Sequence, residues 1–181
     1  MHLLGIETAT RHLSVSLWQD GRCASRAGDH PNGGSQHLLP WIHELLEEGG
    51  IRPADLDGIA FGAGPGSFTG LRLSCGVAQG LGWGLNIPLL AVSTLEALAL
   101  ASGQRRVWAC LDARMNEVYC AGYAVEDDQV TELMAPICAA PAAVPAPNFD
   151  GAWGVGDGFA AHGDLLRSRA PDLLGVQPDA V

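Results

Sequence analysis

One glycine-rich segment constrains the fold of this chain more than any other stretch. It reads GAGPGSFTGLR and occupies residues 62–72. The apolar run before it, at 56–61, is typical of a buried strand, and small and apolar residues recur after it at helical spacing as far as residue 85. The segment therefore predicts a crossover from a strand to a helix. Its glycines allow close backbone approach, and Ser67 or Thr69 can cap the helix.

The start of this helix suits a phosphate or a nucleotide, because free amides and the positive end of the helix dipole face a ligand there. The loop offers Gly64, Gly66, Ser67 and Thr69 as contacts. Unlike a Walker loop, however, the segment has no Lys after its glycines, and it lacks the glycine spacing of a dinucleotide fingerprint. A tight turn that holds no ligand remains the alternative.

Several segments together resemble one protein family. The string GPGSFTGLR at 64–72 closely resembles the TsaB family, also called YeaZ. The string LGIETAT at 4–10 looks like the first strand and turn of that family. LDAR at 111–114 and EVY at 117–119 look like the strand pair that opens its second half. The resemblance covers nearly the whole chain.

The resemblance implies a fold and a function. The fold would be α/β, with two ribonuclease-H-like lobes of the actin-like ATPase, or sugar kinase, superfamily and mixed sheets flanked by helices. The function would be that of a non-catalytic scaffold and activator of TsaD. TsaD is the paralogous transferase that forms threonylcarbamoyladenosine next to the tRNA anticodon.

The resemblance also implies partners and cofactors. The family pairs with a TsaD-type transferase, or with a second copy of itself as a homodimer, through the two helices of the first lobe. A member of the family would contact a TsaE-type ATPase through its complex with TsaD, and it would contact tRNA only indirectly. ATP and a metal ion are expected on the TsaD partner, and no cofactor is expected on this chain by itself.

The predicted elements fit two such lobes. An opening meander of strands, turned at Asp20-Gly21, precedes strands that alternate with helices, which favours a mixed sheet covered by helices on both faces. We expect the first lobe at 1–102 and the second at 103–181. The further elements expected in the first lobe are strands at 3–6, 13–18 and 21–27, a loop at 31–34, a helix at 35–48 capped by Ser35, a buried strand at 87–92 and a helix at 94–101.

The second half repeats the plan of the first. Its strands are expected at 107–111 and 118–125, and a short strand at 153–155 leads into a glycine turn and a helix at 160–167. The segment 136–147 is rich in Ala and Pro and is expected to be a loop. Compared with the family, this lobe looks shortened at its end.

Two acidic residues, Glu7 and Asp112, stand at corresponding strand ends of the two lobes. With Thr8 they are candidate contacts for a phosphate or nucleotide in a cleft between the lobes, although a strand-end acid is more often solvated or caps an amide. The family usually carries Asp where Glu7 stands, which makes a fixed metal geometry less favoured here. A nucleotide-dependent phosphotransferase or ATPase that uses this cleft is the alternative function.

Other catalytic patterns are weak. The 6 His residues include no His-x-x-x-His pair, so no metal site is predicted, and the family resemblance implies a catalytically silent chain. A glycoprotease-type peptidase would need Ser, His and an acid in contact, and no Gly-x-Ser-x-Gly elbow surrounds Ser67. No residue is therefore assigned a catalytic role.

Charge and cysteine content narrow the class of protein further. A net charge of -10 argues against unaided binding to tRNA, because Lys and Arg dominate such affinity. The 5 cysteines are scattered and form no Cys-x-x-Cys pair, so neither a disulfide framework nor a zinc site is indicated.

The apolar run at 81–100 is interrupted by polar residues, and the first residues carry no signal-peptide pattern. We therefore expect a cytoplasmic protein that stays out of the membrane.

The helix at 67–85 carries glycines at every fourth position, Gly76, Gly80 and Gly84, and each costs about 1 kcal/mol relative to Ala inside a helix. Either these glycines pack closely on the sheet of their own lobe, or they form a groove that admits a partner helix. The family resemblance favours the second interpretation. The residues expected at this interface are Leu38, Trp41, Ile42, Leu45, Arg72, Gly76, Gln79, Gly80 and Trp83.

Overall fold

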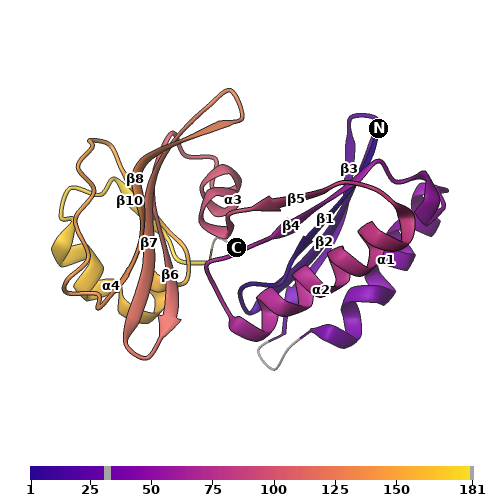
Figure 1. Ribbon diagram of the computed structural model, residues 1–181. Coiled ribbons are helices and arrows are strands. Elements are labelled where there is room, and N and C mark those ends of the chain that lie inside the picture. The colour runs from indigo at the N-terminus through magenta and orange to yellow at the C-terminus, as the bar shows by residue number, and fades with distance from the viewer. Residues whose placement is uncertain (31–33, 180–181) are drawn as a thin grey trace. The chain divides into compact units, whose positions relative to one another are not determined.

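The computed structural model describes residues 1–30 and 34–179 of the chain (Figure 1). The chain divides into two compact units, Met1–Thr94 and Leu95–Val181, each with its own sheet and core. Of the loop predicted at 31–34, residues 31–33 lie outside the described residues.

All of the helix α3 (Thr94–Ala101) except its first residue, Thr94, belongs to the second unit. Its residues Leu95, Leu98 and Ala99 are buried among strands of that unit, because apolar side chains recur along one side of the helix. The boundary between the units therefore lies at the start of this helix and not at 102/103, where the sequence predicted it.

The first unit holds a mixed five-stranded sheet. Its strands are β1 (His2–Glu7), β2 (His12–Gln19), β3 (Arg22–Asp29), β4 (Gly58–Gly62) and β5 (Leu89–Val92), and the 3-10 turn η1 (Pro53–Asp55) precedes β4. They lie in the order β3-β2-β1-β4-β5, in which the first three strands form the predicted antiparallel meander and β4 and β5 run parallel to β1. Between β2 and β3, Asp20 and Gly21 have φ values of 49° and 86°, as a type I′ turn requires.

Two helices, α1 (Ser35–Gly49) and α2 (Phe68–Leu85), cover one face of this sheet (Figure 1). Alternate strand residues point to this face and meet the apolar stripes of the helices in one core. Gly50 ends α1 in the left-handed conformation, and Gly34, not the predicted Ser35, is its N-cap. The core residues are Leu4, Ile6, Leu13, Val15, Leu17 and Ile59 from the strands, Leu38, Ile42, Leu45 and Leu46 from α1, Leu56 and Ala78.

The interface predicted on α1 is wrong at Leu38, Ile42 and Leu45. These side chains are 0%, 5% and 0% exposed and pack against the sheet of their own unit. Trp41 is half-buried and packs against the same core. The apolar stripe of α1 is therefore occupied within the first unit.

The strand β5 is largely exposed, whereas the sequence predicts a buried strand at 87–92. Leu89 and Leu90 are 37% and 64% exposed, and β5 lies at the edge of the sheet. A run of apolar residues does not reveal which strand takes the edge, because an edge strand has a neighbour on one side only.

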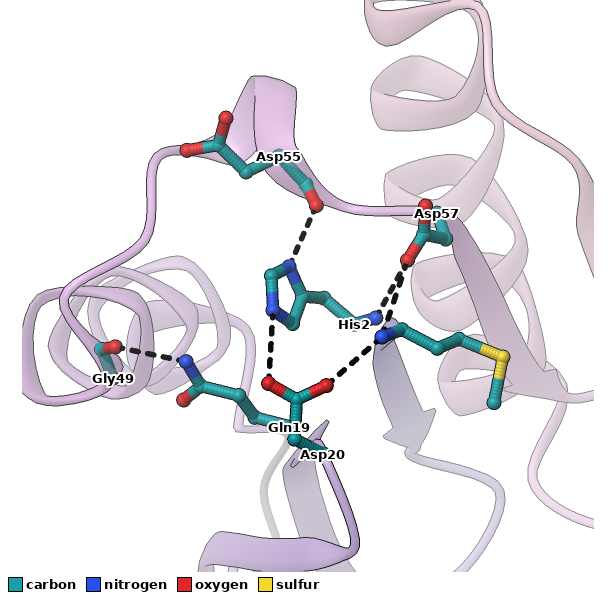
Figure 2. Close-up of polar contacts among 7 residues, drawn as sticks. His2, Gln19, Asp20, Gly49, Asp55 and Asp57 are labelled. Carbon is teal, nitrogen blue, oxygen red and sulfur yellow. Dashed lines mark hydrogen bonds and ion pairs between the residues drawn. The ribbon is translucent and has the colours of Figure 1, made fainter.

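Polar contacts fix the start of β1 to neighbouring segments (Figure 2). The His2 amide donates to Asp57 Oδ2 at 2.7 Å, and His2 Nδ1 lies 2.9 Å from the carbonyl oxygen of Asp55. Gln19 Nε2 donates to the carbonyl oxygen of Gly49 at 3.2 Å, which joins the end of β2 to the end of α1. Hydrogen bonds thus support the core at this end of the first unit.

The second unit repeats the sheet of the first. Its strands are β6 (Arg106–Arg114), β7 (Glu117–Glu126), β8 (Gln129–Ala139), β9 (Trp153–Val155) and β10 (Gly175–Gln177), and α4 (Gly158–Arg169) follows β9. The order β10-β9-β6-β7-β8 again joins an antiparallel meander to two parallel strands, so the predicted repeat is confirmed. The sequence did not predict β8 or β10, and residues 136–139 of the predicted loop belong to β8.

Helices cover both faces of this second sheet. Along β6, Val107, Ala109 and Leu111 share a core with α3, whereas Trp108 and Cys110 share a core with α4. Successive strand residues point to opposite faces, so two cores form. The expectation of helices on both faces of a sheet is confirmed in the second unit, and in the first unit α1 and α2 lie on the same face.

The fold class implied by the resemblance, two α/β lobes with mixed sheets flanked by helices, is confirmed. Of the helices in the described residues, none combines the length and the apolar character needed to cross a membrane.

Leu45 and Leu39 lie on the same helix, and their different burial tests the core of the first unit. Leu45 is 0% exposed and Leu39 is 57% exposed. Leu45→Ala should lower the free energy of unfolding by about 2–5 kcal/mol, because it leaves a cavity, whereas Leu39→Ala should change it by less than about 0.5 kcal/mol. Urea denaturation measures both values, and equal losses would contradict the burial of Leu45.

Candidate functional site

The glycine-rich segment joins β4 to α2, as predicted. Ser67 is the N-cap of α2, and its Oγ accepts from the amide of Gly70 at 3.4 Å. Gly64 has a φ of +97°, a conformation that other residues rarely adopt. The carbonyl oxygen of Gly64 accepts from the amide of Thr94 at 2.8 Å. The segment is therefore held both at its start and at its end.

The same segment lies against the turn that follows β1. The Ser67 amide donates to the carbonyl oxygen of Ala9, and the Thr8 hydroxyl donates to the carbonyl oxygen of Gly70, both at 2.6 Å. A Cβ atom at Gly66 would overlap the Ala9 carbonyl oxygen, and one at Gly70 would overlap that of Thr8. These glycines are therefore required for contact between two backbone segments of the same chain.

Glu7 ends β1 beside this contact, and both of its carboxylate oxygens accept hydrogen bonds. Oε1 accepts from the amide of Ala9 at 2.6 Å, and Oε2 accepts from the hydroxyl of Thr94 at 3.1 Å. Gly62 of β4 lies against the carboxylate and leaves no room for a Cβ atom. Burial raises the pKa of Glu7 above its ordinary value, and the hydrogen bonds from Ala9 and Thr94 oppose this rise only in part.

Asp112 belongs to the second unit and lies near the end of β6. Its amide donates to Asp157 Oδ1, and its own Oδ1 accepts from the amide of Arg114, both at 2.9 Å. The guanidinium of Arg114 and the ring of His162 lie 3.2 Å and 3.8 Å from its carboxylate. Asp112 is thus engaged by residues of its own unit.

The glycine turn predicted after β9 is also present. Gly156 has a φ of +108°, and a Cβ atom at Gly156 or Gly158 would crowd the carbonyl group of Cys110 on β6. As in the first unit, glycines after a parallel strand allow a close approach to the backbone of the neighbouring strand or its turn.

The structure brings most of the predicted ligand contacts together in the first unit and places Asp112 in the second. Sequence reasoning missed Ala9 and Thr94, the partners of Glu7, because their contacts arise only from the folded chain. Within residues 1–30 and 34–179, no three His, Cys, Asp or Glu side chains are grouped so that they could hold a metal ion. The residues brought together are Glu7, Thr8, Gly64, Gly66 and Ser67. Thr69 belongs to the first turn of α2, directly after this segment.

The outer side of α2 carries a row of exposed residues, which we call the glycine face. Among the described residues, a Cβ atom on Gly76, Gly80 or Gly84 would find no neighbour within 4 Å beyond the adjacent helix backbone. The interpretation that these glycines pack on their own sheet is therefore wrong. The glycine face consists of Phe68, Arg72, Gly76, Gln79, Gly80, Trp83 and Gly84, all of them exposed.

Aromatic side chains lie at both ends of the glycine face. Phe68 is 68% exposed near the start of α2, and Trp83 is 91% exposed near its end. The Arg72 guanidinium lies 3.7 Å from the centroid of the Phe68 ring, a cation–π contact. Sequence reasoning missed Phe68, although a large apolar residue directly after the N-cap is the signal that could have indicated it.

Comparison with known proteins identifies the family. Residues 32–162 match the family model of TsaD, described as tRNA N6-adenosine threonylcarbamoyltransferase. The tRNA threonylcarbamoyladenosine biosynthesis protein TsaB of Haemophilus influenzae is 35% identical over 180 residues, which cover 92% of this chain and 76% of that protein. This chain belongs to the TsaB family.

Other members of the TsaB family agree in sequence and fold. YeaZ from Pseudomonas aeruginosa is 36% identical, with a TM-score of 0.88 over 97% of this chain and 83% of that chain. TsaB of Escherichia coli K12 is 40% identical over 134 residues, or 72% of this chain. The match spans 58% of the length of the Escherichia coli protein. The family resemblance seen in the motifs is confirmed.

Substitution by Ala should change the free energy of unfolding in opposite directions at two sets of glycines in this region. Gly66→Ala or Gly70→Ala should lower the free energy of unfolding by about 1–3 kcal/mol or more, because the added Cβ atom overlaps a carbonyl oxygen. Gly76→Ala or Gly80→Ala should raise it by about 0.5–1 kcal/mol, because the added Cβ atom has room and Ala favours the helix. Urea denaturation of the dilute chain checks both signs, and a loss of stability in Gly80→Ala would contradict the open glycine face.

The raised pKa of Glu7 should make stability depend on pH. The folded state binds this proton more tightly than the unfolded state, so the carboxylate weakens the fold at neutral pH. This penalty fades as pH falls through the raised pKa of the folded state, and it is absent below the ordinary value of 4.5. Glu7→Gln keeps an acceptor for the Ala9 amide and carries no charge. It should therefore be the more stable chain at pH 7, by up to about 1 kcal/mol. The gain should shrink toward pH 4 in urea titrations, and a gain that is the same at both pH values would refute this account.

Proposed function

We propose that this chain is a non-catalytic subunit that binds a TsaD-type transferase and activates it in forming threonylcarbamoyladenosine next to the tRNA anticodon. The name of the Haemophilus influenzae relative refers to the biosynthesis of this nucleoside, and the matching family model describes a transferase of this kind. The observation that carries the proposal is the exposed glycine face of α2.

The glycines of this face weaken the helix on its own. Glycine inside a helix costs about 1 kcal/mol relative to Ala. A Cβ atom at Gly76, Gly80 or Gly84 would meet no neighbour in the described part of the chain, so the fold of the first unit gains nothing from the missing side chains. A partner helix can pack closer to α2 at these glycines, because the distance between packed helices depends on the side chains at their contact. The glycine face therefore fits a helix of another protein.

The ends of the glycine face supply anchors for such a partner. Phe68 and Trp83 are about 22 Å apart along the helix axis, at a rise of about 1.5 Å per residue. Exposed aromatic residues of this kind often carry much of the binding energy of an interface. Arg72, held over the Phe68 ring, presents a positive charge between them. A partner with an apolar pocket for Trp83 and an acidic group near Arg72 would match this face.

The contacts of the glycine-rich segment support a role without catalysis by this chain. Both carboxylate oxygens of Glu7 accept hydrogen bonds within the first unit, and Gly66 and Gly70 pack on the backbone of the turn after β1. Glu7 and Gly66 are thus held in contacts within their own unit. We assign ATP and a metal ion to the TsaD partner.

The remaining assignments concern the assembly as a whole. When TsaD is absent, the glycine face would pair two copies of the chain. A TsaE-type ATPase and tRNA would be engaged by the complex and not by the isolated chain. The net charge of -10 supports the assignment for tRNA, since phosphate neutralisation by Lys and Arg dominates affinity for nucleic acid.

The substitution Gly80→Arg tests the proposal, and Gly163→Arg in α4 is its matched control. Both glycines lie in helices, and a Cβ atom at either position has no described neighbour within 4 Å, so both variants should fold. Gly80→Arg should weaken binding to TsaD by about 30-fold or more, because a long cation blocks close approach, and should stop tRNA modification in a reconstituted reaction. Calorimetry, light scattering and a modification assay measure these effects.

The control should retain both TsaD binding and modification. Equal binding of TsaD by the two variants would count against an interface on the glycine face. Circular dichroism shows whether each variant is folded, and unfolding of Gly80→Arg alone would mean that this glycine packs inside its own unit.

A further inference from the structure

Two buried cysteines face each other across β6 and β7. Cys110 and Cys120 are directly paired in the register of these antiparallel strands, and the Cys120 thiol donates to Cys110 Sγ at 2.8 Å. Both side chains are 0% exposed. The scattered spacing of the cysteines in the sequence does not indicate this pair, which arises from the strand register.

The geometry of the pair suits a disulfide bond. Such a bond is about 2.05 Å long, so the two sulfur atoms must approach by roughly 0.8 Å from their separation of 2.8 Å. Directly paired residues of antiparallel strands have Cα atoms about 4.5–5.5 Å apart, which lies within the range of about 4.4–6.8 Å found for disulfides. A small rotation of the two side chains can therefore close the bond while the strands stay paired.

We propose that Cys110 and Cys120 are an oxidation site, at which hydrogen peroxide joins them in a disulfide within the second unit. Peroxide first oxidises one thiol to a sulfenic acid and releases one water molecule. The second thiol then attacks the sulfenic sulfur, the S–S bond forms, and the hydroxyl group leaves with the thiol proton as a second water molecule. In total the thiols lose two hydrogen atoms with their electrons, and the peroxide is reduced to two water molecules.

The surroundings of the pair make this reaction slow and its product durable. Trp108, Val118 and Phe159 enclose the pair in an apolar core. Burial, together with contact with Cys120, raises the pKa of the Cys110 thiol well above its ordinary value. Because thiolate is scarce, oxidation requires brief opening of the core to a small oxidant. The same burial keeps bulky protein reductants away from the disulfide.

The other cysteines are poorly placed to compete for an oxidised Cys110. Cys138 pairs with Tyr119 in the register of β7 and β8, so its side chain lies on the opposite face of the sheet from Cys120. Cys23 and Cys75 belong to the first unit. The thiol already in contact with Cys110 is that of Cys120.

A variant that keeps only this pair tests the proposal. It combines Cys23→Ser, Cys75→Ser and Cys138→Ser, and circular dichroism confirms its fold. The folded variant is treated with hydrogen peroxide, denatured, alkylated with iodoacetamide and analysed by mass spectrometry. Its mass should fall by about 2 Da without alkylation, because the disulfide consumes both thiols. In a matched control that also carries Cys120→Ala, this loss of mass should disappear.

The unsubstituted chain gives a second measurement that does not depend on how the variants fold. Trypsin cleaves after Arg114, between the two cysteines, so peroxide treatment should link the peptide that contains Cys110 to the peptide 115–167. That second peptide contains both Cys120 and Cys138, and its fragmentation should place the link at Cys120. Recovery of both residues as alkylated thiols or with added oxygen, once the exposed Cys23 and Cys138 are fully oxidised, would overturn the proposal. A link from either residue to another cysteine would overturn it as well.

Discussion

The close contact between the glycine-rich segment and the turn after β1 is the constraint on which the first unit depends. Gly66 and Gly70 bring the start of α2 within hydrogen-bonding distance of Thr8 and Ala9. This contact fixes the rotation of α2 about its axis, and with it the residues that face the core. A shift of one residue would turn the helix by about 100°, so the exposure of the glycine face follows from this junction.

The second unit also depends on glycines that approach a neighbouring backbone segment closely. Gly156 and Gly158 lie against the backbone of Cys110. Asp112 lies beside the exposed guanidinium of Arg114 and the ring of His162, whereas the carboxylate of Glu7 is largely buried. In the described chain no helix connects β8 to β9, so this unit has no counterpart of α1. The two units therefore share one strand order and differ in their helices. The first unit has α2 with its exposed glycine face, and the second lacks a counterpart of α1 in the described chain. This division fits the proposal that docking belongs to the first unit.

Most of the fold could be predicted from the sequence, because local signals are strong at the Asp20-Gly21 turn, in the glycine-rich segment at 62–72 and along the helical spacing of apolar residues in α2. Glu132 and Pro136 obscure the alternation of β8, and β10 is only 3 residues long. The candidate site was less predictable. An apolar stripe has the same period whether it packs on its own sheet or on a partner, so the sequence alone does not distinguish the buried Leu45 from an interface residue. The contact of Glu7 with Thr94 depends on the folded chain alone.

The exposed glycines of α2 also bear on what happens to the chain before assembly. A helix that carries glycines on its solvent side opens more readily than one that carries alanines, and opened segments are where proteases act. A partner that covers the helix stabilises the folded state by mass action. On the proposed function, unassembled copies would therefore be cleaved faster than assembled ones, and the supply of the partner would set how much of the chain persists.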